Sequence, residues 1–187
     1  MAIITKGLTR PNIEELFDSD FVNKENYNKK VISGEDFVTQ YSIKDFPVDI
    51  ENFAGKLGIE IRYENLENGI SGKLEKDGER YIITVEGRHP KNRQRFTIAH
   101  EIAHYFLHRN LREKFEDMVF FRGVDKDSAE FQANLFASEI LMPQSQFLEQ
   151  LKTGMNKIED LAQYFGVSTL AIRVRAKQLN LKGHGLW

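Results

Sequence analysis

Apolar and polar residues recur along the first half of the chain with two different periods, which predict a helix followed by strands. Residues 49–57 have the 3.6-residue period of an amphipathic helix, with an aspartate placed to cap its start and a glycine placed to end it. Residues 59–63 alternate between apolar and polar side chains, as a half-buried strand does. The stretch 69–86 is typical of a β-hairpin that turns at Asp77-Gly78.

The helical period dominates the second half of the chain. One helix is predicted from about residue 91 to 108, and a second from about 125–128 to just before Pro143. A third helix begins at Pro143, because proline suits the first helical turn. Residues 156–180 have the pattern of a helix, a tight turn and another helix. The order helix, strand, hairpin and then several helices predicts an α+β fold with a small sheet.

The same pattern divides the chain into three parts. Residues 1–45 are polar and predict an N-terminal extension, with short helices possible at 11–17 and 34–41. Residues 46–150 hold the regular strands and helices, and we expect them to form the main domain. Residues 151–187 are expected to form C-terminal helices that pack on this core.

Composition and charge narrow the class of protein. With 41% hydrophobic and 29% charged residues, the 187-residue chain resembles ordinary globular proteins. The absence of cysteine excludes disulfides, thiolate metal ligands and cysteine nucleophiles. The net charge of −2 does not indicate a nucleic-acid-binding protein, although residues 151–187 are mildly basic. There is no signal-peptide pattern and no apolar run of the ~20 residues that cross a bilayer, so we expect a cytoplasmic protein without membrane contact.

The stretch RFTIAHEIAHYFLHR, residues 95–109, holds three of the chain's five histidines. Helical spacing places His100 and His104 on one face, about 6 Å apart along the axis, where they can share one Zn²⁺. Glu101 completes the H-E-x-x-H pattern and is rotated by about 100°, where a general base for water is expected. His108 lies about 12 Å along the axis from His100, so we expect His108 to be a polar residue at the helix end and not a metal ligand.

The third metal ligand has to come from another segment, and SAEFQANLFASEILMP is the best candidate. Glu130 is the one carboxylate on a narrow stripe of small side chains, which suits a helix pressed against the first. Asn134 lies one turn further, where it could accept a hydrogen bond from a ligand imidazole or make an ordinary helix–helix hydrogen bond. A His₂Glu site leaves a fourth position for water. Other acidic candidates stay open: Glu113, Glu116, Asp117, Asp125 and Asp127.

These two motifs, with the upstream PVDIENFAGKLGIEI, also carry a resemblance. Over about residues 46–181 the sequence resembles the ImmA/IrrE family of metallopeptidases. The resemblance implies a zincin-like core for residues 46–150 and a helix-turn-helix-like unit behind it. It implies that His100, His104 and Glu130 bind the metal and that Glu101 is the catalytic acid/base. It also implies a gluzincin-like endopeptidase, in a mobile-element, stress-response or toxin–antitoxin setting, that cleaves or controls a helix-turn-helix repressor.

The hypothesis for the reaction is peptide-bond hydrolysis. Zinc and Glu101 activate water for attack on the peptide carbonyl, and Glu101 passes the proton to the leaving amine. The His₂Glu set suits Zn²⁺ best, while Mn²⁺ or Fe²⁺ could also occupy it. An extended substrate could pair with the strand near residues 70–74, although an ordinary edge strand explains this stretch at least as well. Five side chains are candidates for stabilising the oxyanion: Tyr63, Tyr81, His89, Arg93 and Arg95.

Two rival functions follow from the C-terminal pattern and the metal site. A helix-turn-helix with Arg173, Arg175 and Lys177 could contact phosphates, which would make the protein a DNA-binding regulator with a non-catalytic zinc site. Against this, the basic excess is small and Arg175 points away from the face shared by the other two. The second rival is a protein that sequesters a repressor or antitoxin without cleaving it. Glu101 argues against that rival, because a structural zinc site needs no base.

Overall fold

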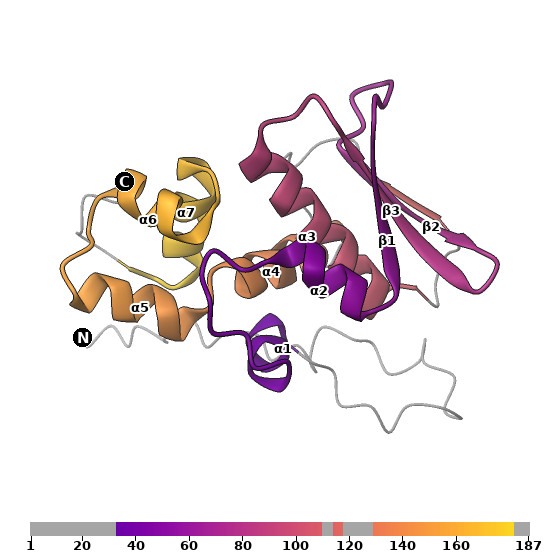
Figure 1. Cartoon of the computed structure of the whole chain (residues 1–187). Helices are drawn as coiled ribbons and strands as arrows, with labels where there is room; N and C mark the ends of the chain where they lie inside the picture. The colour runs from indigo at the N-terminus through magenta and orange to yellow at the C-terminus, as the bar shows by residue number, and fades with distance from the viewer. Residues whose placement is uncertain (1–32, 110–113, 118–128, 182–187) are drawn as a thin grey trace, which may run out of the picture.

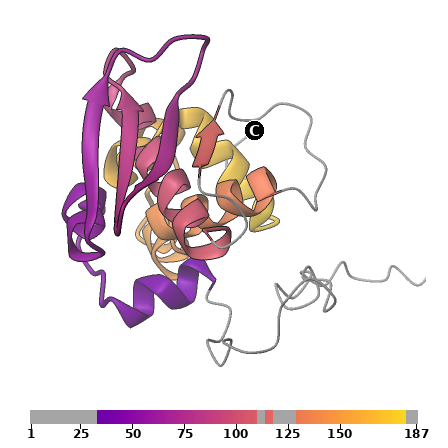
Figure 2. The ribbon, with the colours of Figure 1, turned by 90° about the vertical axis from the view of Figure 1, so that its right-hand side faces the viewer.

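The structure is a computed structural model that describes residues 33–109, 114–117 and 129–181. In this part of the chain a small sheet lies on one side of the long helix α3, and the later helices lie on the other (Figures 1 and 2). The helices are α1 (Gly34–Gln40), α2 (Ile50–Lys56), α3 (Lys91–Leu107), α4 (Ala129–Leu141), α5 (Gln144–Lys152), α6 (Ile158–Phe165) and α7 (Thr169–Gln178). The strands are β1 (Ile59–Glu64), β2 (Gly72–Asp77), β3 (Arg80–Glu86) and β4 (Lys114–Asp117).

The predicted α+β class is confirmed, and so are the first local elements. The Asp49 side chain caps α2 by accepting a hydrogen bond from the Asn52 backbone N–H, and Gly58 follows the helix with a φ of 74°. The hairpin turns after Asp77, where Gly78 has a φ of 61° that suits glycine. The short helix expected at 34–41 is α1, while the one expected at 11–17 lies outside the described residues.

The sheet has the strand order β1-β3-β2-β4. β1 runs parallel to β3, and β2 is antiparallel to both β3 and β4. The prediction that residues near 70–74 form an edge strand is therefore wrong for β2. Strand β4 pairs with Gly72 to Glu75 on the side that β3 leaves open, so β2 has partners along both edges and cannot take a substrate strand there.

Helix α3 is the centre of the core. Every residue from Phe96 to His104 is buried, because the sheet covers one side of the helix and α4 covers another. Most of these side chains are apolar or small, but His100, Glu101 and His104 are buried among them. Buried ionisable groups are costly unless they are paired or bind a metal, so these three side chains make α3 a candidate functional element.

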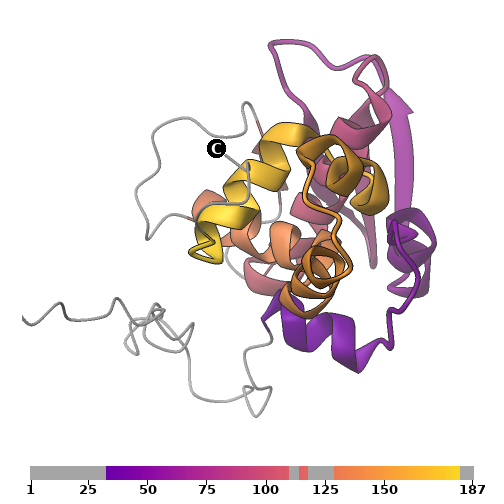
Figure 3. The ribbon, with the colours of Figure 1, turned by 90° about the vertical axis from the view of Figure 1, so that its left-hand side faces the viewer.

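The C-terminal helices α6 and α7 are joined by a short turn at Gly166, whose φ is 62° (Figure 3). Ser168 caps α7 by accepting a hydrogen bond from the Ala171 backbone N–H. The turn is attached to the start of α3, because Asn92 donates to the Val167 carbonyl and Arg95 donates to the Gly166 carbonyl. These contacts fasten the turn to α3, and the division of the chain into three parts stays a prediction. Among the described helices, none combines the length and the apolar character needed to span a bilayer.

Arg175 lies in the interior rather than on the surface of α7. Its side chain is fully buried, donates from Nε to the Met142 carbonyl at 2.9 Å, and makes an ion pair with Glu35 of α1. The expectation that Arg175 could meet a phosphate is therefore wrong. Arg173 and Lys177 are exposed on the same helix. The described structure thus leaves two of the three basic residues available at the surface of α7.

Replacing Arg175 with lysine is expected to lower the free energy of unfolding by about 1–3 kcal/mol. Lysine keeps the charge, but its ammonium group lacks the planar guanidinium that lets Arg175 donate to both the Met142 carbonyl and the Glu35 carboxylate. One buried acceptor therefore loses its hydrogen bond. Urea unfolding would measure the change. Arg173→Lys on the exposed face is the matched control and should stay within about 0.5 kcal/mol of the parent. Equal stability of the two variants would contradict the proposed role of Arg175.

Glu86 is a buried carboxylate that ties the end of β3 to the loop before β2. It accepts hydrogen bonds from the Arg88 side chain and backbone and from the Leu66 backbone N–H at 2.8 Å. These hydrogen bonds, those of the Arg88 side chain above all, lower the pKa of Glu86 from 4.5 to about 2. The carboxylate form is therefore stabilised by folding.

Because the pKa of Glu86 is lowered in the folded state, its contribution to stability is present above about pH 4.5. It is expected to disappear as the pH falls from about 4.5 toward 2. Glu86→Gln should lower stability at neutral pH and flatten the pH dependence of unfolding in that range. Urea unfolding at a series of pH values would test this, with the exposed turn residue Glu79→Gln as control. An unchanged slope in Glu86→Gln would rule the contribution out.

Candidate metal centre

His100 and His104 form one wall of the candidate site. Both lie on the face of α3 that meets α4, and both side chains are buried, with exposed fractions of 0% and 1%. Their Nε2 atoms lie 3.0 Å apart. The four-residue spacing in the sequence therefore brings the two imidazoles to a common point, as the helical period predicted.

Glu130 approaches this point from the first turn of α4. Its carboxylate oxygens lie 3.2 Å from His100 Nε2 and 3.4 Å from His104 Nε2. Two ligands of a tetrahedral zinc ion, each about 2.0–2.1 Å from the metal, are about 3.3 Å apart. The three distances of 3.0, 3.2 and 3.4 Å are close to that value. Two imidazoles and a carboxylate at these separations fit a single divalent metal ion, and together they could hold one.

The protonation states of His104 and Glu130 also suit metal binding. Burial lowers the pKa of His104 to about 4, which keeps its imidazole neutral at pH 7. Burial raises the pKa of Glu130, but the hydrogen bonds with His100 and His104 outweigh this and hold it below the usual range. A neutral imidazole and a carboxylate are the forms that coordinate metals.

Asn134 lies one turn after Glu130 on α4. Its Oδ1 is 3.2 Å from His100 Nδ1, the ring nitrogen on the opposite side from the shared point. A hydrogen bond in this position fixes which nitrogen of the ring carries the proton. This is the contact that the sequence suggested for Asn134, and its role at a metal stays a prediction.

His108 has a contact that sequence reasoning missed. It ends α3 and is 2% exposed, with its Nδ1 3.0 Å from His104 Nδ1. Its Nε2 is 3.1 Å from Oε1 of Gln132 on α4. Among the described residues the candidate metal group is His100, His104 and Glu130, and it stays a prediction that His108 is not a ligand. Burial lowers the pKa of His108, so it is not the protonated residue that a helix C-terminus would favour.

Glu101 lies on the sheet side of α3. Its side chain is buried, and its Oε1 would be 3.1 Å from a Cβ placed on Gly72 of β2. That Cβ would also overlap the Thr97 methyl group. Gly72 therefore allows the strand to approach the helix where the predicted base is found. Sequence reasoning missed this residue, although a glycine at the start of a strand is a signal of close backbone approach.

The other sequence candidates make contacts of their own or lie outside the described residues. Arg95 donates to the Val48 and Gly166 carbonyls, and Tyr63 donates to Glu51. Arg93 donates to the Ser71 hydroxyl. Tyr81 packs edge-on against Tyr105, and burial lowers the pKa of His89. Of the alternative ligands, Glu113, Asp125 and Asp127 lie outside the described residues, and Glu116 and Asp117 belong to β4.

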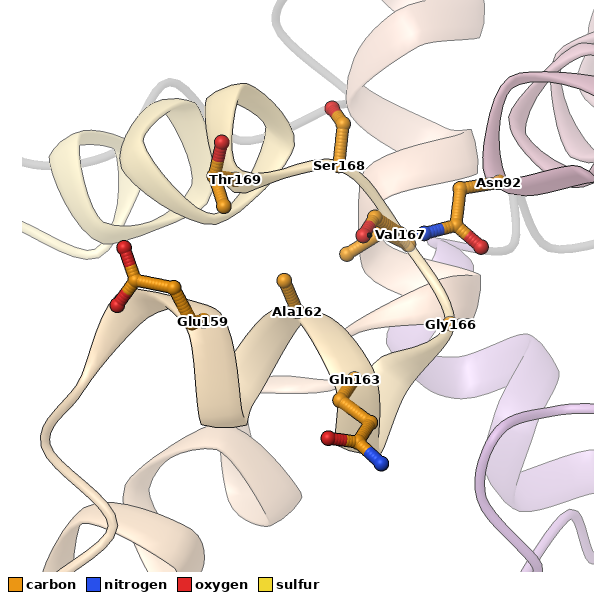
Figure 4. A pocket seen from close by; sticks show the side chains of 8 residues that line it. All are labelled: Asn92, Glu159, Ala162, Gln163, Gly166, Val167, Ser168 and Thr169. Atoms are coloured by element: carbon orange, nitrogen blue, oxygen red, sulfur yellow. Dashed lines mark hydrogen bonds between the residues drawn. The ribbon is translucent and has the colours of Figure 1, made fainter. Parts of the chain in front are cut away.

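A separate cavity of about 410 Å³ lies at the turn between α6 and α7 (Figure 4). It is lined by Asn92 at the start of α3 and by Glu159 and Gly166, among others. None of the three candidate metal ligands lines it. The cavity is therefore distinct from the candidate metal centre.

The fold and the site define a mixed α+β protein with a candidate His₂Glu metal centre between two packed helices. Residues 54–177, more than half of the chain, match the family model of the IrrE N-terminal-like domain. The chain therefore belongs to the ImmA/IrrE family of metallopeptidases, as the resemblance predicted.

Metallopeptidase ImmA of Bacillus subtilis (strain 168) is a relative that is 36% identical over 107 residues. The match covers 56% of this chain and 60% of the relative, so it spans less than two thirds of either protein. The region that matches the family model, residues 54–177, includes both the H-E-x-x-H segment and the segment of α4. A metal ion is implied by the family and suits the donor atoms described above.

Proposed function

We propose that the protein is a zinc-dependent endopeptidase whose metal is held by His100, His104 and Glu130. The observation that carries this proposal is the convergence of donor atoms where α3 meets α4: the Nε2 atoms of His100 and His104 lie 3.0 Å apart, and one Glu130 carboxylate oxygen lies 3.2 Å from the first and the other lies 3.4 Å from the second. Three protein ligands leave a coordination position for water or substrate, which is the arrangement of hydrolytic rather than structural zinc sites.

In this proposal Glu101 is the catalytic acid/base. Bound zinc would act as a Lewis acid and lower the pKa of a water molecule. Glu101 takes a proton from the attacking water and later gives it to the leaving amine. One carboxylate can do both, because the two steps occur in sequence. Its burial against Gly72 holds the carboxylate in one place, which favours transfer along a fixed direction.

Zinc is the metal that we propose, because two imidazoles and one carboxylate suit its tetrahedral preference. Mn²⁺ and Fe²⁺ bind the same ligand types and are the alternatives. Metal analysis of the purified protein would decide between these ions.

The substrate is proposed to be a protein, and within that class a helix-turn-helix repressor or antitoxin. This finer step rests on the resemblance to the ImmA/IrrE family, whose setting in mobile elements, stress responses or toxin–antitoxin pairs supplies such a partner. A cytoplasmic location is part of the same proposal, because a repressor acts there.

The rival function of DNA-binding regulator has less support. Arg175 is buried in an ion pair with Glu35, which leaves Arg173 and Lys177 as the basic residues exposed on α7. Non-specific DNA affinity grows with the number of phosphates neutralised, so two exposed cations contribute little. The rival of a sequestering protein without turnover predicts the same metal site, and only an assay of cleavage distinguishes it.

The proposal is tested by metal analysis together with incubation against the repressor encoded next to the gene. We expect about one zinc ion per chain, cleavage of the repressor into two fragments, and loss of cleavage after treatment with a chelator. Restored cleavage on adding zinc is the control for the chelator. An intact repressor that binds a fully loaded protein would support sequestration instead, and tight DNA binding with a steep salt dependence would support the regulator.

A further inference from the structure

We propose that His108 is a positioning residue that holds the His104 imidazole in its metal-binding orientation and tautomer. Gln132 ends this row of hydrogen bonds. The inference deepens the proposed function, because it rests on a metal at His100, His104 and Glu130. It assigns a role to the third histidine of the pattern, which is neither a ligand nor the base.

Three side chains form a continuous row behind the candidate metal centre. His104 Nδ1 is 3.0 Å from His108 Nδ1, and His108 Nε2 is 3.1 Å from Gln132 Oε1. His104 and His108 are 1% and 2% exposed, so water has little access to the contact between the two rings. Both distances lie within the range of hydrogen bonds.

The row has one consistent arrangement of protons when His104 ligates through Nε2. A neutral imidazole that uses the lone pair of Nε2 carries its proton on Nδ1, so His104 donates to His108 Nδ1. His108 Nδ1 then has no proton, and the proton of His108 is on Nε2, where it donates to Gln132 Oε1. The glutamine carbonyl is an acceptor with no proton to return, so it fixes the direction of the whole row.

The two ligand histidines are supported in different ways from the same helix. Asn134 of α4 faces His100 directly, whereas Gln132 of α4 reaches His104 through His108. Glu130 of the same helix faces the Nε2 atoms of both rings. The first two turns of α4 therefore supply one candidate ligand and two acceptors, and docking of α4 on α3 orders the histidines as well as the carboxylate.

The sequence spacing explains why a histidine fills this position. His108 lies four residues after His104, so its ring stands one turn further along the same face and can contact the outer edge of the His104 ring. A carboxylate there would bring a buried negative charge close to the Glu130 carboxylate. A neutral imidazole accepts the hydrogen bond without that charge.

The test compares zinc affinity, by competition with a chelator, in the full chain and in matched variants. His108→Phe keeps a ring but removes the acceptor, and we expect zinc affinity to fall by about 10–100-fold. His108→Asn places an amide oxygen near the position of Nδ1, and we expect a loss of less than about tenfold. His89→Phe makes the same substitution at a half-buried histidine outside the row, and its zinc affinity should not change.

A second readout reports the tautomers directly. Long-range ¹H–¹⁵N spectra of the zinc-loaded protein should show His104 protonated on Nδ1 and His108 protonated on Nε2 alone. In His108→Asn, which removes the second ring, the His104 Nδ1 proton should remain protected from exchange. In His108→Phe it should exchange faster, because no acceptor holds it. A merely structural role in packing would not separate these two variants.

The outcomes separate the inference from the proposed function. Equal zinc affinity in the parent and His108→Phe, or a His108 ring protonated on Nδ1 in the loaded protein, overturns the role of His108 and leaves the peptidase proposal intact. A parent chain that takes up no divalent metal overturns the proposed function, and this inference with it. If His108→Phe does not fold, the Asn variant and the parent spectra still decide the question.

Discussion

Replacing Glu101 with glutamine is expected to slow peptide cleavage by about 10²–10⁴-fold while the protein keeps its metal and its fold. Glutamine has the shape of glutamate, so it fits the buried space between α3 and Gly72. It cannot accept a proton from the attacking water at neutral pH, and the general-base contribution is lost. Initial rates against a cleaved substrate, measured at saturating zinc, would give the size of the effect.

Zinc content and thermal stability are the controls for Glu101→Gln, since both should match the parent. Glu101→Asp is the graded variant, because its carboxylate can accept a proton but lies further from the substrate side. We expect it to retain part of the activity that the glutamine variant loses. Unchanged cleavage in Glu101→Gln would show that another group activates the water.

Replacing Glu130 with glutamine is expected to weaken zinc binding by more than about 100-fold. This exceeds the loss typical of a residue that only orients a ligand, because a charged donor atom is replaced by a neutral amide oxygen. The parent should be stabilised by zinc, by about 2.7 kcal/mol at a free zinc concentration 100 times the dissociation constant. Thermal unfolding with and without zinc would show this stabilisation in the parent and little of it in the variant.

Glu159→Gln is the matched control for Glu130→Gln. Glu159 is likewise an exposed glutamate in the first turn of a helix, but it lines the cavity at α6 and α7. Its zinc-dependent stabilisation should equal that of the parent. If Glu130→Gln keeps the affinity of the parent, the third ligand is another group, and the acidic residues between 113 and 127 become the next to test.

Expectations that depended on contacts close in the sequence were correct, whereas two that depended on contacts distant in the sequence were wrong. Asp49 capped α2 and Gly78 turned the hairpin as expected, because caps and turns depend on neighbours a few residues away. The position of β2 as an edge strand was wrong because β4, some forty residues later, pairs with it. The surface role expected of Arg175 was wrong because its partner Glu35 belongs to a helix 140 residues earlier.

The candidate site was partly readable from the sequence for the same reason. His100 and His104 share a face of α3, and Glu101 is rotated away from it, because 3.6 residues per turn is a property of any α-helix. The sequence could name Glu130 and Asn134 as suitable residues, since they lie on one stripe of a helix with small side chains. It could not place them at 3.2–3.4 Å from the imidazoles, because that depends on how α4 docks on α3.

The sequence by itself determined the helical pattern of α3, the two histidines that face one another and the family to which the chain belongs. The tertiary structure decided which carboxylate meets them, what lies behind His104 and whether Arg175 is exposed. The physical reason is that spacing along a helix is set by local backbone geometry. Contacts between helices are set by the packing of the whole core: helical spacing brings His108 to the His104 ring, but only the docking of α4 gives His108 its partner Gln132.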